Sequence, residues 1–172
     1  MAMLHIVLLN PEIPQNTGNI ARTCAATGAR LELIKPLGFE ISDKYLKRAG
    51  LDYWHMMEMR VHESWQDFLA AYPDAQLFFT SKKARACYCD VKFPEESFIV
   101  FGRESCGLPE ELIAANYDRC LRIPMREGAR SLNLSNSAAI MAYEYLRQHG
   151  FAGLEKQGSM QCDGGAEWRD YL

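Results

Sequence analysis

Long hydrophobic runs are missing from this 172-residue sequence, and none approaches the ~20 residues that a membrane-spanning helix needs. The first apolar run is short and ends at Asn10-Pro11, with no charged leader and no small-residue cleavage site around it. We therefore expect a cytoplasmic protein without a membrane segment. The length is sufficient for one domain with a hydrophobic core.

Zinc-finger cysteine spacing is also missing. The chain has six cysteines, but Cys87 and Cys89 form a C-x-C pair with no second Cys/His pair at the spacing of a structural zinc site. Without a secretory signal, thiols are expected to stay reduced. The sequence therefore predicts neither a disulfide framework nor a bound metal.

Three common catalytic motifs are absent as well. The segment from Gly102 to Gly107 has the G-x4-G frame of a phosphate loop, but Leu108-Pro109 follows where Lys-Ser/Thr would stand. No G-x-G-x-x-G stretch and no G-x-S-x-G elbow occurs. These absences disfavour a nucleoside triphosphatase, a dinucleotide-binding enzyme and a serine hydrolase.

A strong excess of positive charge is lacking too, since the formal net charge is −3. This excludes a globally basic nucleic-acid binder, but local basic clusters remain. They are Lys44, Lys47 and Arg48; Lys82, Lys83 and Arg85; and Arg122, Arg126 and Arg130. Each cluster taken singly is typical of a solvated surface. Clusters that converge on one face would still allow an acidic protein to bind RNA.

Apolar runs alternate with helical patterns along the chain, which predicts an α/β fold with a mostly parallel sheet and helices on both faces. The expected strands cover residues 4–9, 31–35, 56–61, 75–81, 98–102 and 119–123. The expected helices cover residues 16–27, 43–49, 65–72, a segment opening at 108–111, and 133–149. Gly28 and Ser64 are expected to cap two of these helices. Residues 1–156 should form a single domain, followed by a polar, loosely ordered tail over 157–172.

Ligands of parallel sheets gather at the carboxyl ends of the strands, and three segments there combine suitable groups. The helix start at residues 16–22 could hold a phosphate near Arg22, or could be a plain helix capped by Asn16. The Gly102–Gly107 segment permits close approach of a ligand to the backbone, with Glu104 available to bond it, or is a structural turn. Residues 131–137 hold more small polar side chains than one helix cap needs, although Ser131 or Asn133 could be that cap.

Taken in order, these segments resemble the SPOUT superfamily of RNA methyltransferases, and within it the TrmL-type (YibK-like) tRNA 2′-O-methyltransferases. The resemblance covers roughly residues 3 to 154. The segments that carry it are residues 11–19 with Arg22, Gly38-Phe39 with residues 47–53, residues 101–104 with 107–109, and residues 123–125 with 130–136. Residue patterns alone favour an unknotted sheet, because knots are nearly absent from proteins. The resemblance implies a C-terminal deep trefoil knot instead.

The resemblance also implies the reaction and its partners. S-adenosylmethionine would be bound in the knot and leave as S-adenosylhomocysteine. The methyl group would go to the wobble nucleotide, position 34, a cytidine or modified uridine, of leucine tRNAs. The family works as homodimers, here through the N-terminal and C-terminal helices, and the helix over 133–149 is apolar on most faces, as a subunit interface or a central core helix would be. The implied cofactor residues are Thr80, Gly102, Glu104, Gly107, Ile123, Met125, Ser131, Leu132 and Asn133.

Arg22 is the first candidate for catalysis, with Glu104 and Tyr143 as secondary candidates to orient the ribose hydroxyl or relay its proton. A guanidinium stays protonated, so Arg22 should anchor a phosphate and stabilise developing oxyanion charge rather than act as a base. The expected RNA contacts are Asn16, Asn19, Arg22, Lys47, Arg48, Lys83 and Arg130. Arg103 stands where many relatives have Pro, which leaves the set of tRNAs open. A ribosomal RNA target, another tRNA site, or RNA binding without catalysis are the alternatives.

Overall fold

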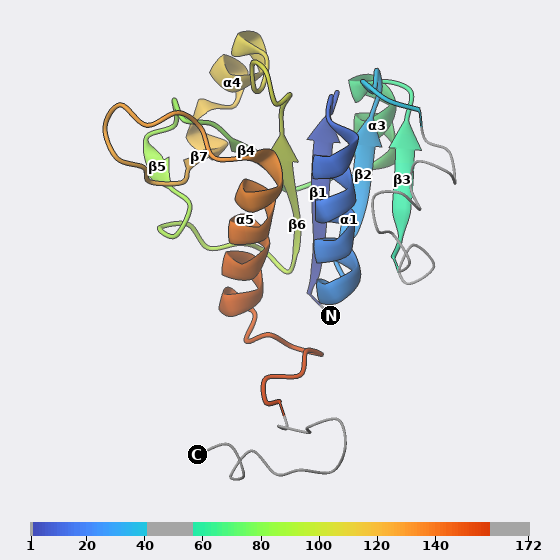
Figure 1. Cartoon of the computed structure of the whole chain (residues 1–172), viewed down its shortest axis with the longest axis vertical. Helices are drawn as coiled ribbons and strands as arrows, with labels where there is room; N and C mark the ends of the chain where they lie inside the picture. Colours follow the sequence, from blue (N-terminus) through green and yellow to red (C-terminus); the bar gives the residue numbers. More distant parts are fainter. Residues whose placement is uncertain (1, 41–56, 159–172) are drawn as a thin grey trace, which may run out of the picture.

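The computed structural model describes residues 2–40 and 57–158, which form one seven-stranded sheet in the order β3-β2-β1-β6-β4-β7-β5 (Figure 1). Every pair of neighbouring strands is parallel, which confirms the predicted parallel sheet. The strands are β1 (Met3–Leu9), β2 (Arg30–Ile34), β3 (Met59–His62), β4 (Leu77–Thr80), β5 (Ala86–Cys87), β6 (Glu96–Phe101) and β7 (Cys120–Arg122). The helices are α1 (Pro14–Thr27), α3 (Trp65–Ala71), α4 (Glu110–Ala115), the short 3-10 helix η2 (Tyr117–Arg119) and α5 (Leu134–Gln148).

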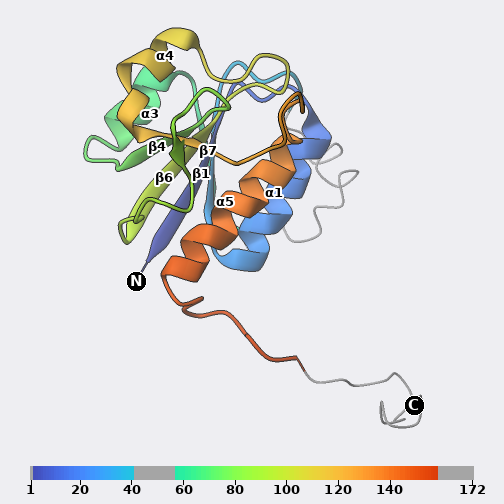
Figure 2. The same ribbon diagram turned by 90° about the vertical axis from the view of Figure 1, so that its left-hand side faces the viewer.

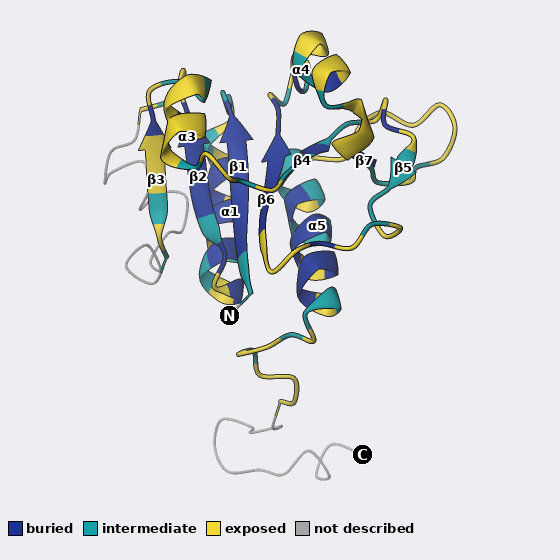
Figure 3. Cartoon of the chain, turned by 180° about the vertical axis from the view of Figure 1, so that it is seen from behind, coloured by how far each residue is buried: buried dark blue, intermediate teal, exposed yellow. Residues whose placement is uncertain are grey.

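Helices cover both faces of the sheet, as predicted. Helices α1 and α5 lie side by side on one face, and α3 and α4 lie on the other (Figure 2). Alternate residues of β1 therefore enter different cores. Ile6 packs with Ile20 of α1 and Met141 of α5, whereas Val7 packs with Phe68 of α3. Both faces of the central strands are buried (Figure 3), and their sequences accordingly read as continuous apolar runs.

The predicted caps of two helices are confirmed, and one is wrong. Gly28 ends α1 with φ 74°, and its N–H donates to the Cys24 carbonyl. The Ser64 hydroxyl accepts from the Asp67 N–H at the start of α3. Helix α1, however, begins at Pro14 rather than Asn16, and Ile13 is its N-cap residue. The proline fits because it has no N–H to leave unpaired in a first helical turn.

A polar cluster is buried beneath α3, on the face of the sheet away from α1. The Glu32 carboxylate bonds the rings of His5 and His62 at 3.0 and 2.7 Å, and it accepts from the Tyr72 hydroxyl at 2.6 Å. Burial raises the pKa of Glu32, but the hydrogen bonds from His5, Tyr72 and His62 outweigh it and hold this pKa below the ordinary value. Burial beside Glu32 raises the pKa of Tyr72 to about 12. The cluster joins β1, β2, β3 and the end of α3.

Because all strands are parallel, the loops that leave their carboxyl ends meet at one edge of the sheet. The segments after β1, β4, β6 and β7 gather there, as the sequence predicted. The helix expected over 43–49 lies outside the described residues, as does the tail from residue 159. None of the helices within residues 2–40 and 57–158 has the length and hydrophobicity of a membrane-spanning helix.

Candidate functional site

A cavity of about 430 Å³ opens at the carboxyl edge, between the loops that follow β4, β6 and β7. All nine residues predicted for the cofactor line it: Thr80, Gly102, Glu104, Gly107, Ile123, Met125, Ser131, Leu132 and Asn133. Its volume lies in the range of small-molecule sites. Apolar side chains such as Leu108, Leu121 and Ile123 lie beside the polar groups. The structure therefore brings together residues that are up to 53 positions apart in the sequence.

The turn after β6 closes on itself and requires glycine at positions 102 and 107. The N–H of Arg103 donates to the Gly107 carbonyl at 3.1 Å, and the N–H of Gly107 donates back at 2.8 Å. A Cβ at Gly102 would lie 2.1 Å from the Gly107 carbonyl carbon, and Gly107 itself has φ 78°. The predicted close backbone approach at these glycines is thus an approach of the turn to itself.

The Glu104 carboxylate faces the start of α1 instead of standing alone in the cavity. It accepts from the backbone N–H groups of Glu12 and Ile13 at 2.8 and 3.2 Å, and from the Asn16 side-chain amide at 3.1 Å. The first turn of α1 carries no acidic residue, so Glu104 supplies the negative charge that a helix N-terminus favours. The carboxylate occupies the helix start, for which the sequence left open a bound phosphate or a plain cap.

Glu12 returns the contact from the other side. Its carboxylate accepts from the Ser105 N–H at 3.0 Å and from the Ser105 hydroxyl at 2.9 Å. These two hydrogen bonds, together with the nearby charge of Arg103, lower the pKa of Glu12. The loop before α1 and the turn after β6 therefore hold each other through two carboxylates.

Asn133 links the third loop to this pair. Its side-chain amide donates to the Asn16 side-chain oxygen at 2.9 Å. Its own oxygen accepts from the N–H groups of Ser135 and Asn136 at the start of α5. Asn133 is therefore the N-cap of α5, one of the alternatives the sequence left open, while it also lines the cavity.

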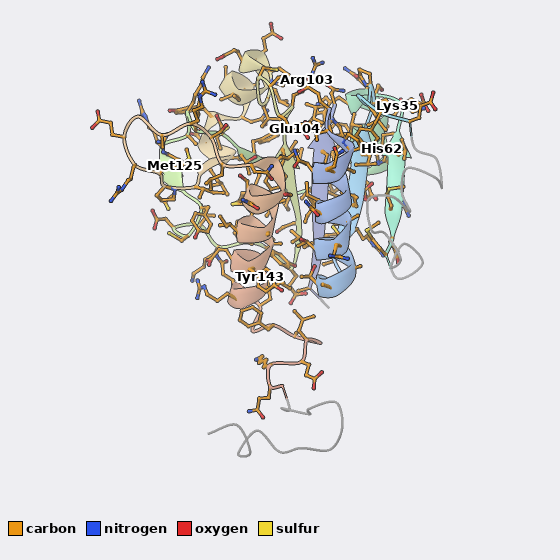
Figure 4. The ribbon with its side chains drawn as sticks, in the orientation of Figure 1. Lys35, His62, Arg103, Glu104, Met125 and Tyr143 are labelled. Carbon is orange, nitrogen blue, oxygen red and sulfur yellow. The ribbon has the colours of Figure 1, made fainter. Side chains whose placement is uncertain are left out.

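The remaining predicted residues divide into two groups. Asn16 and Lys83 line the cavity, and Lys83 pairs with Glu110. Arg22, Asn19, Arg130 and Tyr143 are exposed, and none of these described residues lines the cavity. Figure 4 shows Tyr143 far along α5 from Glu104. Lys47 and Arg48 lie outside the described residues.

Arg22 does not lie next to the start of its helix, contrary to the sequence interpretation. It follows Pro14 by eight positions, which places it about 12 Å along the helix axis. The helix starts two residues earlier than predicted, and this moves Arg22 further from the first turn. Within one chain, a substrate that contacts both the cavity and Arg22 would extend along α1.

Sequence reasoning did not select Glu12 or Ser105, although each lies inside a segment that it singled out. Both carry polar side chains inside the segments 11–19 and 102–107. Their partners lie 93 positions apart, so the pairing could not be read from local pattern. A carboxylate just before a helix start that lacks a capping side chain was the available signal.

The sequence matches the SpoU rRNA Methylase family over residues 3–143. A relative from Methylovorus glucosotrophus named tRNA (cytidine(34)-2′-O)-methyltransferase is 51% identical over 152 residues, which cover 88% of this chain and 99% of the relative. Such identity over nearly both full lengths leaves no appended domain unmatched in that protein.

Two solved structures extend the comparison. One, which concerns 2′-OH methylation of C/U34 on tRNA, has a TM-score of 0.81 and 48% identity, covering 87% of this chain and 97% of the other. An AdoMet-bound rRNA methyltransferase from Sinorhizobium meliloti has a TM-score of 0.74 and 26% identity, covering 84% of this chain and 56% of that longer one.

Proposed function

The chain belongs to the SpoU rRNA methylase family, and we propose that it methylates the ribose 2′-hydroxyl at wobble position 34, cytidine or modified uridine, of leucine tRNAs. Its fold is the knotted SPOUT α/β fold. The knot implied by the sequence resemblance is therefore confirmed, although knots are nearly absent from proteins in general. One observation supports the activity most: three motifs distant in sequence meet at one cavity on the carboxyl edge.

S-adenosylmethionine is the methyl donor in this proposal, and the residues of the cavity fit it. Apolar side chains such as Leu108, Ile123 and Leu132 suit an adenine ring, while Thr80, Ser131 and Asn133 offer polar atoms to its hydroxyl, amino and carboxyl groups. When bound, the sulfonium supplies an already activated methyl group. The protein must then mainly position the ribose and exclude competing nucleophiles.

Arg22 acts on the RNA rather than on the cofactor in this proposal, because it lies outside the cavity on the exposed side of α1. Its guanidinium binds the phosphate beside the target ribose and stabilises charge on the 2′-oxygen as the proton leaves. Glu104 is already engaged by α1, so it positions that helix. These contacts leave its carboxylate poorly suited to taking the proton.

A homodimer would use the surface formed by α1 and α5. The two helices pack side by side, and Tyr143 on α5 remains 51% exposed. Ile13, before α1, is 42% exposed. The resemblance to a family of homodimers places the interface at these two helices, where both apolar side chains are exposed.

One experiment tests the reaction and its target together. The purified protein is incubated with total tRNA, or with ribosomal RNA, and isotopically labelled S-adenosylmethionine, and the methylated nucleotide is mapped by mass spectrometry. We expect label on the ribose of nucleotide 34 of leucine tRNAs. Label in ribosomal RNA or at another tRNA position would contradict the substrate, and tRNA binding without label would contradict the activity.

A further inference from the structure

Six hydrogen bonds join the loop before α1 and the first turn of α1 to the turn after β6. One runs from the Arg103 guanidinium to the Asn10 side-chain oxygen. The other five have a carboxylate as acceptor, and they involve Glu12 and Ile13 of the loop and Asn16 of α1 on one side, and Glu104 and Ser105 on the other. We call these five residues the carboxylate clasp. Each carboxylate accepts from the opposite segment, so neither segment can shift without breaking bonds to both.

The clasp connects two rigid parts of the molecule. On one side, the backbone pairing of Arg103 with Gly107 closes the turn, whose Glu104 and Ser105 line the cavity. On the other side, α1 is a continuous helix of 14 residues. Ile13, the N-cap residue of α1, makes no side-chain hydrogen bond to the start of the helix. The clasp therefore holds the first turn of α1, whereas Ile20, Ala21 and Cys24, which are buried in the core, fix the rest of the helix.

One side of the clasp is open to solvent. Ser105 and Ile13 are exposed and Glu104 is half-buried, whereas Asn16 is buried. Hydrogen bonds on its exposed side compete with water, which lowers their net contribution. A ligand that contacts the turn in the cavity would favour the clasped arrangement in so far as it binds that arrangement more tightly than an unclasped one.

We propose that the carboxylate clasp couples cofactor binding to tRNA binding, with Glu12 as a positioning residue for α1. This inference rests on the proposed function, in which the cavity holds the cofactor and α1 contacts RNA. An occupied cavity holds the turn, the turn holds Glu12 and Asn16, and the first turn of α1 is then fixed in the position in which Asn16 contacts the RNA. Linkage requires the reverse effect as well, so bound tRNA must tighten cofactor binding by the same factor.

The test measures S-adenosylhomocysteine affinity by calorimetry on the full chain, with and without saturating leucine tRNA. For the unmodified protein we expect tRNA to tighten binding by about 5-fold or more, the lower end of typical allosteric coupling. Glu12→Ala removes both bonds to Ser105 and leaves the three bonds of Glu104, so this ratio should fall toward 1, while binding of each ligand alone persists. At saturating S-adenosylmethionine, the variant should show a raised KM for tRNA.

Conservative variants separate this role from a merely structural one. In Glu12→Gln the amide oxygen can accept from the Ser105 N–H and the amide N–H can donate to its hydroxyl, so coupling should be largely retained. Ser105→Ala removes the bond from the Ser105 hydroxyl to Glu12 but keeps the bond from the Ser105 N–H, so this variant should retain part of the coupling. Glu111→Ala, at an exposed carboxylate outside the clasp, is the matched control and should keep the full ratio.

Two results would overturn the inference: an unmodified protein that binds S-adenosylhomocysteine equally well with and without tRNA, or a Glu12→Ala protein that keeps the full ratio. If Glu12→Ala does not fold, an undiminished ratio in Ser105→Ala overturns it instead. Failure of the proposed function looks different, because the unmodified protein would then bind no S-adenosylhomocysteine or transfer no methyl group to nucleotide 34.

Discussion

At the scale of single residues, Glu104 and Asn133 each serve two segments. Glu104 lines the cavity and accepts hydrogen bonds from the loop before α1, while Asn133 lines the same cavity and caps α5. Such residues link ligand affinity to local stability. Substitutions that remove one role without the other can therefore separate the two.

Asn133 and Ser131 form a matched pair for this purpose. Asn133→Ala should weaken S-adenosylmethionine binding and also lower the free energy of unfolding by about 1 kcal/mol, because α5 loses its N-cap. Ser131→Ala should weaken binding alone, since Ser131 is not the cap. Calorimetry and urea denaturation measure the two effects. Unchanged cofactor affinity in both variants would contradict their assignment to the cofactor site.

Arg22→Ala should reduce methyl transfer by about 10²-fold or more, since removing a charge-stabilising donor from a transition state has this size of effect. S-adenosylhomocysteine affinity should stay nearly unchanged, because Arg22 lies outside the cavity lining. Single-turnover assays and calorimetry check the two statements. Full activity in Arg22→Ala would exclude the proposed role. Arg22→Lys should retain only part of the activity, because lysine lacks the bidentate donor geometry of the guanidinium.

At the scale of elements, the buried cluster around Glu32 fixes β3 against β2 and α3. The pKa of the Glu32 carboxyl group is lower in the folded protein than in the unfolded chain. As pH falls, Glu32 is therefore protonated in the unfolded chain before it is protonated in the folded protein. The stabilisation is fully present above the ordinary carboxyl pKa, and it is lost as pH falls through the lower pKa of the folded protein. We expect stability to decline between about pH 5 and the acid range for this reason.

Glu32→Gln should flatten that part of the pH profile and lower stability near neutrality by about 1–3 kcal/mol, since it disturbs a hydrogen-bonded buried charge. Urea denaturation at a series of pH values measures both changes. Glu58→Gln is the matched control, because Glu58 forms an exposed ion pair with Arg30, and such pairs contribute little. Equal profiles for the two variants would contradict the assignment to Glu32.

The loop between β4 and β5 carries the basic cluster Lys82, Lys83 and Arg85, and both of its lysines line the cavity. Charge reversal by Lys82→Glu with Lys83→Glu should weaken tRNA binding and lower the slope of log K against log salt concentration by roughly 0.7–0.9 per lost phosphate contact. Lys92→Glu, in the loop before β6, is the control. Filter binding across salt concentrations distinguishes them, and an unchanged slope would mean that the cluster is only a solvated surface.

Local pattern predicted the elements far better than the contacts between them. The apolar runs of β1 and β6 and the caps at Gly28 and Ser64 follow from short-range chemistry, and they were predicted correctly. Strand β5 was missed because it has two residues. The start of α1 was misplaced because Glu104, a residue about 90 positions away, stabilises it. The cofactor residues came from the resemblance, since spacing alone identified only loops suited to a ligand.

At the scale of the whole molecule, the proposed dimer predicts a particle of twice the 19.6 kDa chain mass in light scattering. Tyr143→Asp should shift this toward the monomer, because a carboxylate would have to be buried without a partner. The circular dichroism spectrum should stay unchanged, since Tyr143 is half-exposed in a single chain. Leu69→Asp on α3, on the other face, should leave the mass unchanged. A monomeric unmodified protein would rule out the homodimer.

The direction of the parallel strands also determines how the protein can be handled. The first strand starts at the edge opposite the cavity, and α5 starts at the cavity and runs away from it (Figure 1). A tether or fluorophore attached at the amino terminus would therefore leave the mouth of the site open to a large RNA. Surface-immobilised protein should bind tRNA in single-molecule recordings as it does when diffusing freely.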